Sequence, residues 1–202
     1  MAVKSVNELR ALYPQVNIRA KHKVIDHIDE HCRDFIASSP FFLLATTNGQ
    51  DVDVSPKGDP AGSVVIEEGA KAILIADRPG NNRLDGLENI LKNPWVGTIF
   101  LIPGVHETLR INGPATIHAE PEILDQCLVN GRRPLTVTRV ETEEVYLHCA
   151  KALIRSKLWD PGTWPGARPV PTMGEMIRDH TGSDVEFETQ EQMLKRYETQ
   201  LY

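Results

Sequence analysis

The sequence predicts a mainly β fold with flanking helices, in which roughly six short strands form an antiparallel sheet that closes into a barrel. Three observations indicate this class. Short apolar runs of strand length follow one another from Phe41 onward, turns rich in Gly and Pro separate them, and helical patterns flank and interrupt them. We expect a single domain over 1–202, with N-terminal helices over about 1–38 and a C-terminal helical tail over about 172–202.

The N-terminal segment is expected to be helical. Ser5 and Glu8 have the spacing of a capping box, and Pro14 marks the end of a first short helix. Apolar residues then recur at helical spacing from about Lys23 to Ser38, which predicts a second helix that Pro40 stops.

The strands are expected at the apolar runs that follow. Asn48-Gly49 is a hairpin turn signal between the first two runs, and the segment SPKGDPAG at 55–62 is expected to be a connecting loop. The strand regions are FFLLATT (41–47), VDV (52–54), SVVIE (63–67), AILIAD (72–77), WVGTIFLIPG (95–104), ETLRINGPATIHAE (107–120) and RPLTVTRVETEEVYLHCA (133–150). The last of these is interpreted as one strand region.

Three further helices are expected among and after the strands. One covers 82–92, where leucines recur at helical spacing before Asn93-Pro94 ends it. Another runs from Pro121 to a C-cap at Gly131. The third lies within 149–159, and the proline-rich segment after it is a linker or an extended arm.

Charge and cysteine content exclude several classes of protein. The formal net charge of −6 argues against a general nucleic-acid binder, which needs a basic surface to displace counterions from phosphates. Cys32, Cys127 and Cys149 form no Cys-x-x-Cys pair, so neither a disulfide framework nor a cysteine zinc site is expected. The sequence shows no signal-peptide pattern and no apolar run of membrane-spanning length, so we expect a cytoplasmic protein that does not bind membranes.

Four segments, in this order, resemble the pyridoxamine 5′-phosphate oxidase-like FMN-binding split-barrel family, and within it the subfamily named probable FMN-dependent enzymes. The segments are DVDVSPKGDPAG (51–62), LIADRPGNNRLDGLENILKNPWVGTIFLIPG (74–104), ETLRINGPATI (107–117) and HCAKALIRSKLWDP (148–161). The resemblance covers about residues 35–165. It implies a six-stranded antiparallel split β-barrel and a homodimer that holds two FMN molecules at the subunit interface.

The first group of candidate cofactor ligands is Ser55, Lys57 and Gly58. FMN carries a dianionic phosphate, and these residues offer a hydroxyl, a point charge and close backbone approach. The same residue types are also ordinary in a hairpin connection, so turn chemistry alone is an alternative explanation.

The second group is Asp77, Asn81, Asn82 and Arg83, which follows a strand and precedes a helix. Helix N-termini bind anions, and a cation such as Arg83 in the first turn is unfavourable unless an anion accompanies it. Asn82 and Arg83 match the place of the family's phosphate-binding Ser-Arg-Lys, but Arg-Lys is absent and the spacing to Asn-Pro differs by one, so the assignment among Asn81, Asn82 and Arg83 stays open. The alternative is a solvated Arg83 behind a plain Asn82 N-cap.

Thr108 and Arg110 form the third group. Thr108 falls where the oxidase has a flavin-contacting Gln, which reaches farther than Thr. As an alternative, both are outward-facing residues of a strand with alternating polarity.

The fourth group is Lys151, Arg155, Ser156 and Trp159. On a helix, Lys151 and Arg155 share one face, and a bound anion would relieve the repulsion between their like charges. Trp159 could cover the isoalloxazine ring. Trp159 could equally pack in the core or at a dimer contact. The resemblance implies that this segment reaches the FMN that the other subunit binds.

The sequence His27-Ile28-Asp29-Glu30-His31 matches an inverted zinc-protease motif. Such a site needs a third ligand and a cleft from a larger domain, so we interpret the motif as part of a surface helix and expect no metal site.

The resulting hypothesis is an FMN-dependent oxidoreductase acting on an unknown small molecule, with no catalytic residue assigned. Pyridoxamine phosphate is not the expected substrate, because WDPGTWPGARPVP at 159–171 replaces the oxidase's pattern of Trp followed by Arg-Leu-x-Pro. The alternative is a flavin-binding protein without turnover, for carriage, storage or redox sensing. A heme- or deazaflavin-binding relative on the same barrel is a third possibility.

Overall fold

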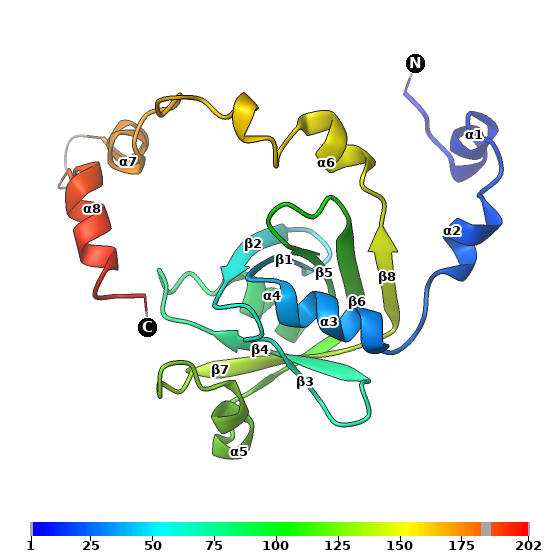
Figure 1. The fold of residues 1–202 in the computed structure, drawn as a ribbon, viewed down its shortest axis with the longest axis horizontal. Coiled ribbons are helices and arrows are strands. Elements are labelled where there is room, and N and C mark those ends of the chain that lie inside the picture. The colour runs from blue at the N-terminus through cyan, green and yellow to red at the C-terminus, as the bar shows by residue number, and fades with distance from the viewer. Residues whose placement is uncertain (1, 183–186, 202) are drawn as a thin grey trace.

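The computed structural model describes residues 2–182 and 187–201. Its centre is an antiparallel sheet of eight strands that curls into a barrel (Figure 1). The strands are β1 Phe41–Thr47, β2 Val52–Gly58, β3 Val65–Ile66, β4 Ala72–Asp77, β5 Trp95–Leu101, β6 Thr108–His118, β7 Thr136–Glu141 and β8 Glu144–His148. Their order in the sheet is β2-β1-β5-β6-β7-β4-β3, and β8 pairs with β6.

The predicted class, a split β-barrel with flanking helices, is confirmed, but the predicted number of six strands is wrong. The last predicted strand region is two strands, β7 and β8, which are separated by Thr142 and Glu143. The Thr142 side chain donates a hydrogen bond to the Asp26 carbonyl at 3.0 Å, outside the strand ladder.

The long strand β6 joins the two halves of the barrel. Its first part pairs with β5 and β8, and its last four residues, from Ala115 to His118, pair with β7. Gly113 lies near the end of the part that pairs with β5, opposite Val96, and a Cβ at this position would overlap the Glu141 carbonyl oxygen. Glycine is therefore required where β6 passes β7 at close range.

The core fills the interior of the barrel. Alternating residues of β1, β5 and β6 point inward, and the Phe42 and Phe100 rings stack with their centroids 4.7 Å apart. A smaller apolar cluster consists of Leu74, Leu124, Cys127 and Val137. Period-two alternation along β1, β5 and β6 accounts for their part of the larger cluster, whereas β4 is buried on both faces and contributes to both clusters.

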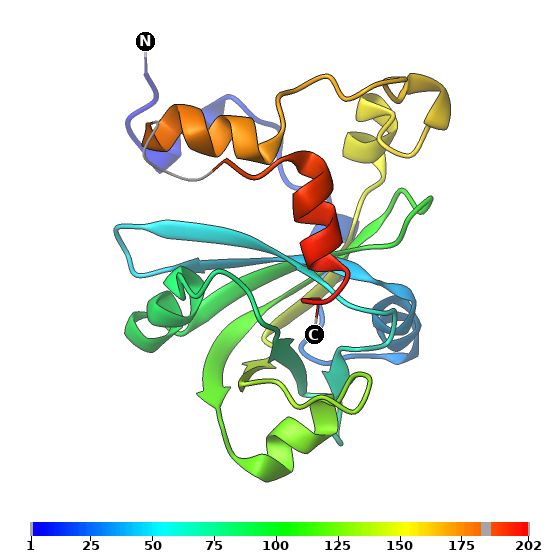
Figure 2. The same ribbon diagram turned by 90° about the vertical axis from the view of Figure 1, so that its left-hand side faces the viewer.

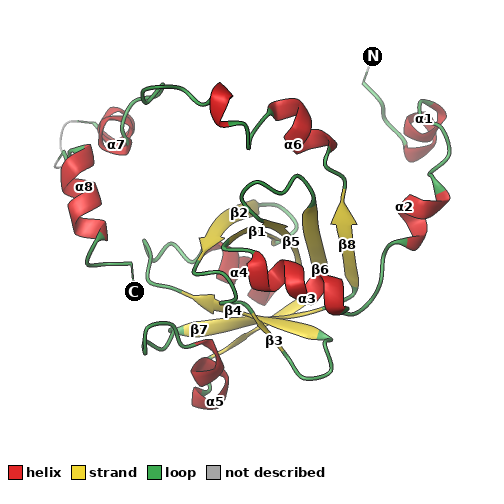
Figure 3. Cartoon of the chain, viewed as in Figure 1, coloured by secondary structure: helices red, strands yellow, loops and turns green. Residues whose placement is uncertain are grey.

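The helices surround the strands (Figure 3). They are α1 Val6–Ala11, α2 Ile18–His22, α3 Glu30–Ser38, α4 Asp85–Lys92, α5 Pro121–Leu124, α6 Lys151–Ser156, α7 Met173–Thr181 and α8 Gln190–Tyr197, with 3₁₀ turns at Asp125–Cys127 and Pro161–Thr163. The Ser5 side chain accepts a hydrogen bond from the Glu8 amide, which confirms Ser5 as an N-cap.

The predicted start of the second helix and the predicted end of the helix at Pro121 are wrong. The second helix starts at Glu30 rather than Lys23, because Asp29 caps it through the Cys32 amide and Ile25 pairs instead with Val145 of β8. The helix that begins at Pro121 ends at Leu124, well before Gly131.

The terminal segments lie outside the barrel. In two perpendicular views, α1 and α7 lie beyond the same side of the barrel (Figures 1 and 2). Large apolar side chains on these segments are exposed, among them Leu12, Met176 and Leu194. None of the described helices combines the length and apolar character needed for a membrane span.

Candidate functional site

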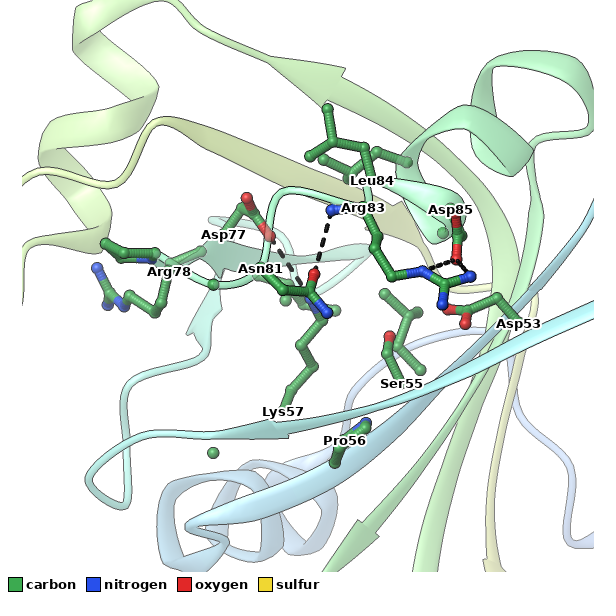
Figure 4. Close-up of a pocket in the computed structure, with 18 of the residues that line it drawn as sticks. Asp53, Ser55, Pro56, Lys57, Asp77, Arg78, Asn81, Arg83, Leu84 and Asp85 are labelled. Atoms are coloured by element: carbon green, nitrogen blue, oxygen red, sulfur yellow. Dashed lines mark hydrogen bonds and ion pairs between the residues drawn. The ribbon is translucent and has the colours of Figure 1, made fainter. Parts of the chain in front are cut away.

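A cavity of about 660 Å³ lies between β2, β4 and the connection from Arg78 to Leu87 (Figure 4). Its volume falls within the range of roughly 300–1,000 Å³ that is usual for small-molecule sites. Seven predicted ligands line it, namely Ser55, Lys57, Gly58, Asp77, Asn81, Asn82 and Arg83. The apolar part of the wall includes Phe42, Leu44, Val64 and Ile75.

Strand β2 supplies one wall of the cavity. Ser55 lies opposite the buried Leu44 in the register with β1, and Lys57 lies opposite the buried Phe42. Cross-strand partners point to the same face, so Ser55 and Lys57 face the barrel interior. The prediction that this segment is a loop is therefore wrong, because 55–58 is the end of an edge strand.

Two ion pairs cross the opening of the barrel. The Lys57 ammonium lies 3.5 Å from an Asp77 carboxylate oxygen, and these side chains are 27% and 21% exposed. The Arg78 guanidinium lies 2.8 Å from the Asp59 carboxylate and also donates to the Cys127 carbonyl. These contacts link the end of β4 to β2, to the segment after it and to the turn after α5.

The segment before α4 has an unusual backbone. Asn82 and Leu84 both have φ of +59°, in the left-handed region that costs most side chains about 1–2 kcal/mol. The Asn81 side chain accepts a hydrogen bond from the Arg83 amide at 3.1 Å. The prediction that the helix starts at Asn82 is wrong, because right-handed backbone begins only at Asp85.

The N-terminus of α4 faces the cavity. Its N-cap, Leu84, makes no side-chain capping hydrogen bond, and the cavity is lined by the first helical residues, Asp85, Gly86 and Leu87. Amides in a first turn have no partner within the helix, so this end of α4 can bind an anion.

Close packing holds α4 in place. A Cβ on Gly86 would lie 3.1 Å from Asp53 Oδ2 and 3.6 Å from Thr46 Oγ1. The buried Asn89 side chain donates to Thr46 Oγ1 at 3.2 Å. Glycine at 86 thus allows the first turn of α4 to lie directly against β1 and β2.

The charges on the cavity wall are nearly balanced. Arg83 pairs with Asp85 at 2.7 Å, as Lys57 does with Asp77 and Arg78 with Asp59. Figure 4 shows the Arg83 guanidinium between Asp85 and Asp53. Within the described chain, the Asp53 carboxylate forms no ion pair or hydrogen bond. Four carboxylates therefore face three cations, which makes the wall net −1.

Thr108 and Arg110 do not line this cavity. They alternate with the buried Leu109 and Ile111, so they lie on the outer face of β6. The Arg110 guanidinium lies 5.3 Å from the centroid of the Tyr146 ring, and its Nε is buried without a hydrogen-bond partner among the described residues.

The fourth group is also separate from the cavity. Lys151, Arg155 and Ser156 are exposed on α6, beyond the end of β8 (Figure 1). Trp159 is half-buried, and its indole donates a hydrogen bond to the Val105 carbonyl at 2.9 Å. A single copy of the chain therefore brings seven of the predicted ligands together and leaves six outside.

Sequence reasoning missed Asp53, Asp59, Arg78 and Gly86. The alternation of Asp53, Ser55 and Lys57 was a usable signal, since period two places all three on one face of a strand. The packing of Gly86 against Asp53 depends on tertiary contacts and left no local signal.

The inverted zinc-protease motif does not form a site. His27 precedes α3 instead of lying on it, and it pairs with Asp26 at 3.0 Å. Across 2–182 and 187–201, no group of three His, Cys, Asp or Glu side chains is arranged to hold a metal ion.

A family model and several solved structures match this chain. The model of the family described as Pyridoxamine 5′-phosphate oxidase matches residues 28–149, more than half of the chain. No curated protein matches.

Several solved structures are similar in fold. HupZ from Group A Streptococcus is 18% identical, with 59% of this chain and 93% of that chain covered and a TM-score of 0.48. The General Stress Protein 26 from Bacillus anthracis str. Sterne is 14% identical, with coverages of 58% and 93% and a TM-score of 0.43. The FAD binding protein from Mycobacterium smegmatis is 14% identical, with coverages of 61% and 97% and a TM-score of 0.44.

Proposed function

Because the chain belongs to the pyridoxamine 5′-phosphate oxidase family, we propose that its cavity binds FMN non-covalently. We further propose that it is a cytoplasmic FMN-dependent oxidoreductase acting on a small molecule. The observation that carries the proposal is the convergence of Lys57, Arg83 and the uncapped first turn of α4 on one cavity with an apolar wall. These features match the parts of FMN, which has a dianionic phosphate, a polar ribityl chain and a flat, largely apolar ring.

The phosphate would bind at the α4 end of the cavity. Lys57 and Arg83 supply cations there, and the amides of the first turn supply hydrogen-bond donors. Gly86 allows the first turn of α4 to lie against β1 and β2 at this end of the cavity, since a Cβ would crowd Asp53. Ser55 and Asn82 would support the phosphate and the ribityl chain, and the apolar residues Phe42, Leu44 and Ile75 would contact the ring.

When bound, the flavin supplies the hydride or electron chemistry. The described cavity wall contains no histidine, cysteine or tyrosine. The chain's own residues would therefore bind and orient the flavin and exclude water, and no side chain is assigned as a catalytic acid or base.

A second copy of the chain would complete the site. The wall is net −1, so a dianionic phosphate needs further cations. Lys151, Arg155 and Lys157 form no ion pair in the described structure, and the α6 segment 151–159 contains no acidic residue. This charge complementarity supports a homodimer with FMN at the interface, in which α6, Trp159 and Arg110 of one copy approach the cavity of the other.

The first experiment is an absorption spectrum of the purified protein before and after incubation with FMN and gel filtration. Retained flavin bands and one FMN per chain support the proposal, whereas a colourless protein that retains no FMN contradicts it. A heme or a deazaflavin would be identified by its own spectrum.

Substitutions then test the phosphate end. Lys57→Gln and Arg83→Gln should each weaken FMN binding by about 10- to 100-fold, which is the loss of one charge-assisted hydrogen bond. Lys21→Gln and Arg33→Gln remove the same charge from exposed positions away from the cavity, so they should leave FMN binding unchanged.

The cavity wall without histidine, cysteine or tyrosine also favours the alternative of a flavin carrier, store or sensor without turnover. Mixing the FMN-loaded protein with NADH or NADPH under anaerobic conditions separates the two functions. Rapid bleaching of the flavin, followed by reoxidation by an added acceptor, supports the oxidoreductase. A flavin that stays oxidised with both donors supports the binding protein.

A further inference from the structure

A second cavity, of about 430 Å³, adjoins the α4 end of the first. The two cavities share Asp53, Arg83 and Asp85. The second cavity adds Asp51, Glu88 and Lys92, so that four carboxylates face two cations and its wall is net −2. Any group that extends past Arg83 from the first cavity therefore meets a more negative surface.

The carboxylates around this junction are held by the fold. Asp53 lies against Gly86 in the first turn of α4, and its carboxylate forms no ion pair in the described structure. Figure 4 shows the Arg83 guanidinium between Asp53 and Asp85, and Arg83 is paired with Asp85 at 2.7 Å. Asp53 thus brings a carboxylate without an ion pair of its own to the boundary between the cavities.

FMN and FAD differ in the way that they would present charge at this boundary. FMN ends in one phosphate that carries both negative charges, whereas FAD divides its two charges between two phosphates and continues into adenosine. With FAD, the first phosphate would bring only one charge to Lys57 and Arg83. The second phosphate would then face the carboxylates beyond them.

We propose that the carboxylates of Asp53 and Glu88 make this site selective for a flavin mononucleotide over a flavin dinucleotide by repelling a second phosphate. This inference rests on the proposed flavin binding and adds the residues that determine which flavin is bound. Selectivity comes from charge, so isosteric neutral substitutions should relax it while the shape of the cavity is kept.

The test measures the dissociation constants of FMN and FAD by quenching of flavin fluorescence. The preference for FMN, given by the ratio of the two constants, should fall by about three- to tenfold in Asp53→Asn and in Glu88→Gln, with the larger fall in the double variant. Glu68→Gln removes an exposed carboxylate elsewhere and should leave the ratio unchanged. Glu88 is exposed, so Glu88→Gln keeps the test informative if Asp53→Asn fails to fold.

The outcomes separate this inference from the proposed function. A wild-type protein that binds neither flavin contradicts both. A protein that binds FMN but whose preference over FAD is absent, or is unchanged in both variants, contradicts only the role of these carboxylates. A preference that is present but unchanged in both variants would point to selection by the size of the cavity.

Discussion

The Lys57 ammonium lies 3.5 Å from the Asp77 carboxylate, although the strands that carry them are not neighbours in the sheet. β2 ends the sheet on one side, and β4 is next to β3, which ends it on the other. The pair therefore bridges the opening of the barrel beside the cavity. Both side chains are partly exposed, so the pair contributes on the order of 1 kcal/mol and can be rearranged by a ligand.

The first prediction concerns competition for Lys57. Asp77→Asn should tighten FMN binding by about two- to fivefold at low salt, because a carboxylate that competes with the phosphate is removed. Fluorescence titration measures the change. The control is Asp125→Asn, which removes an exposed carboxylate that pairs with Arg133 away from the cavity. Weaker binding in Asp77→Asn would instead mean that this carboxylate contacts the flavin, as the sequence predicts.

The second prediction concerns Trp159, whose indole joins the start of the C-terminal segment to Val105. Trp159→Phe keeps an aromatic ring but removes the indole N–H and with it a hydrogen bond of about 0.5–1.5 kcal/mol. Hydrogen exchange of amides in 157–163 should become faster while that of the β-strands stays the same. Trp95→Phe, on an exposed position of β5, is the matched control. Unchanged exchange in 157–163 would show that other contacts hold the segment.

The sequence predicted the fold class because strand-length apolar runs and turn signals are local properties. It failed at 55–58, where Pro56 and Gly58 are typical of turns. These residues occur in a strand because β2 lies at the edge of the sheet, where proline can be accommodated. Only the sheet order reveals that edge, and the sequence does not encode it locally.

The candidate site was also predicted only in part, because its residues come together through the sheet order and the tertiary structure. Ser55, Lys57 and Arg83 line one cavity only in the folded chain, but their residue types alone suggested anion binding. Arg110 was placed in the same site although strand alternation puts it on the face opposite to Leu109 and Ile111. Within one copy of the chain its side chain lies away from the cavity, and the sequence does not show which predicted ligands would act within one copy and which across the expected dimer interface.

The third prediction concerns Gly113, where β6 passes β7. Gly113→Ala places a methyl group on the Glu141 carbonyl, so β6 and β7 must move apart. This should lower the free energy of unfolding by about 3 kcal/mol or more. Urea denaturation measures the loss. Gly166→Ala, where a Cβ meets no atom within 4 Å, should change the stability by less than about 0.5 kcal/mol. Equal stability of the two variants would contradict the close approach of β6 and β7.

The fourth prediction concerns the buried thiol of Cys32. Burial, and after it the Asp29 carboxylate, raise the pKa of Cys32 from 9.0 to about 12. Between these values the unfolded chain loses this proton while the folded chain keeps it. The stability that the protonated Cys32 thiol contributes is therefore fully present below about pH 9 and is lost as the pH rises toward 12.

Urea midpoints measured from pH 8 to pH 10.5 test this dependence. The free energy of unfolding should fall over that interval, with up to about 2 kcal/mol of the fall due to Cys32. Cys32→Ala should show a shallower decline than the wild type, whereas Cys149→Ala, which removes an exposed thiol, should not. Parallel declines in the wild type and in Cys32→Ala would contradict the assignment.

The last prediction asks which copy of the chain supplies α6 to each site. One variant carries Lys57→Gln and Arg83→Gln in the cavity, and a second carries Lys151→Gln and Arg155→Gln on α6; each alone should lose FMN. If α6 acts on the other copy, a heterodimer contains one site with an intact cavity and an intact α6. Random exchange of subunits in an equal mixture should then restore about a quarter of the wild-type FMN capacity. If α6 acts on its own cavity, no combination rebuilds a complete site, so the mixture stays without FMN; gel filtration followed by flavin absorbance distinguishes the two results.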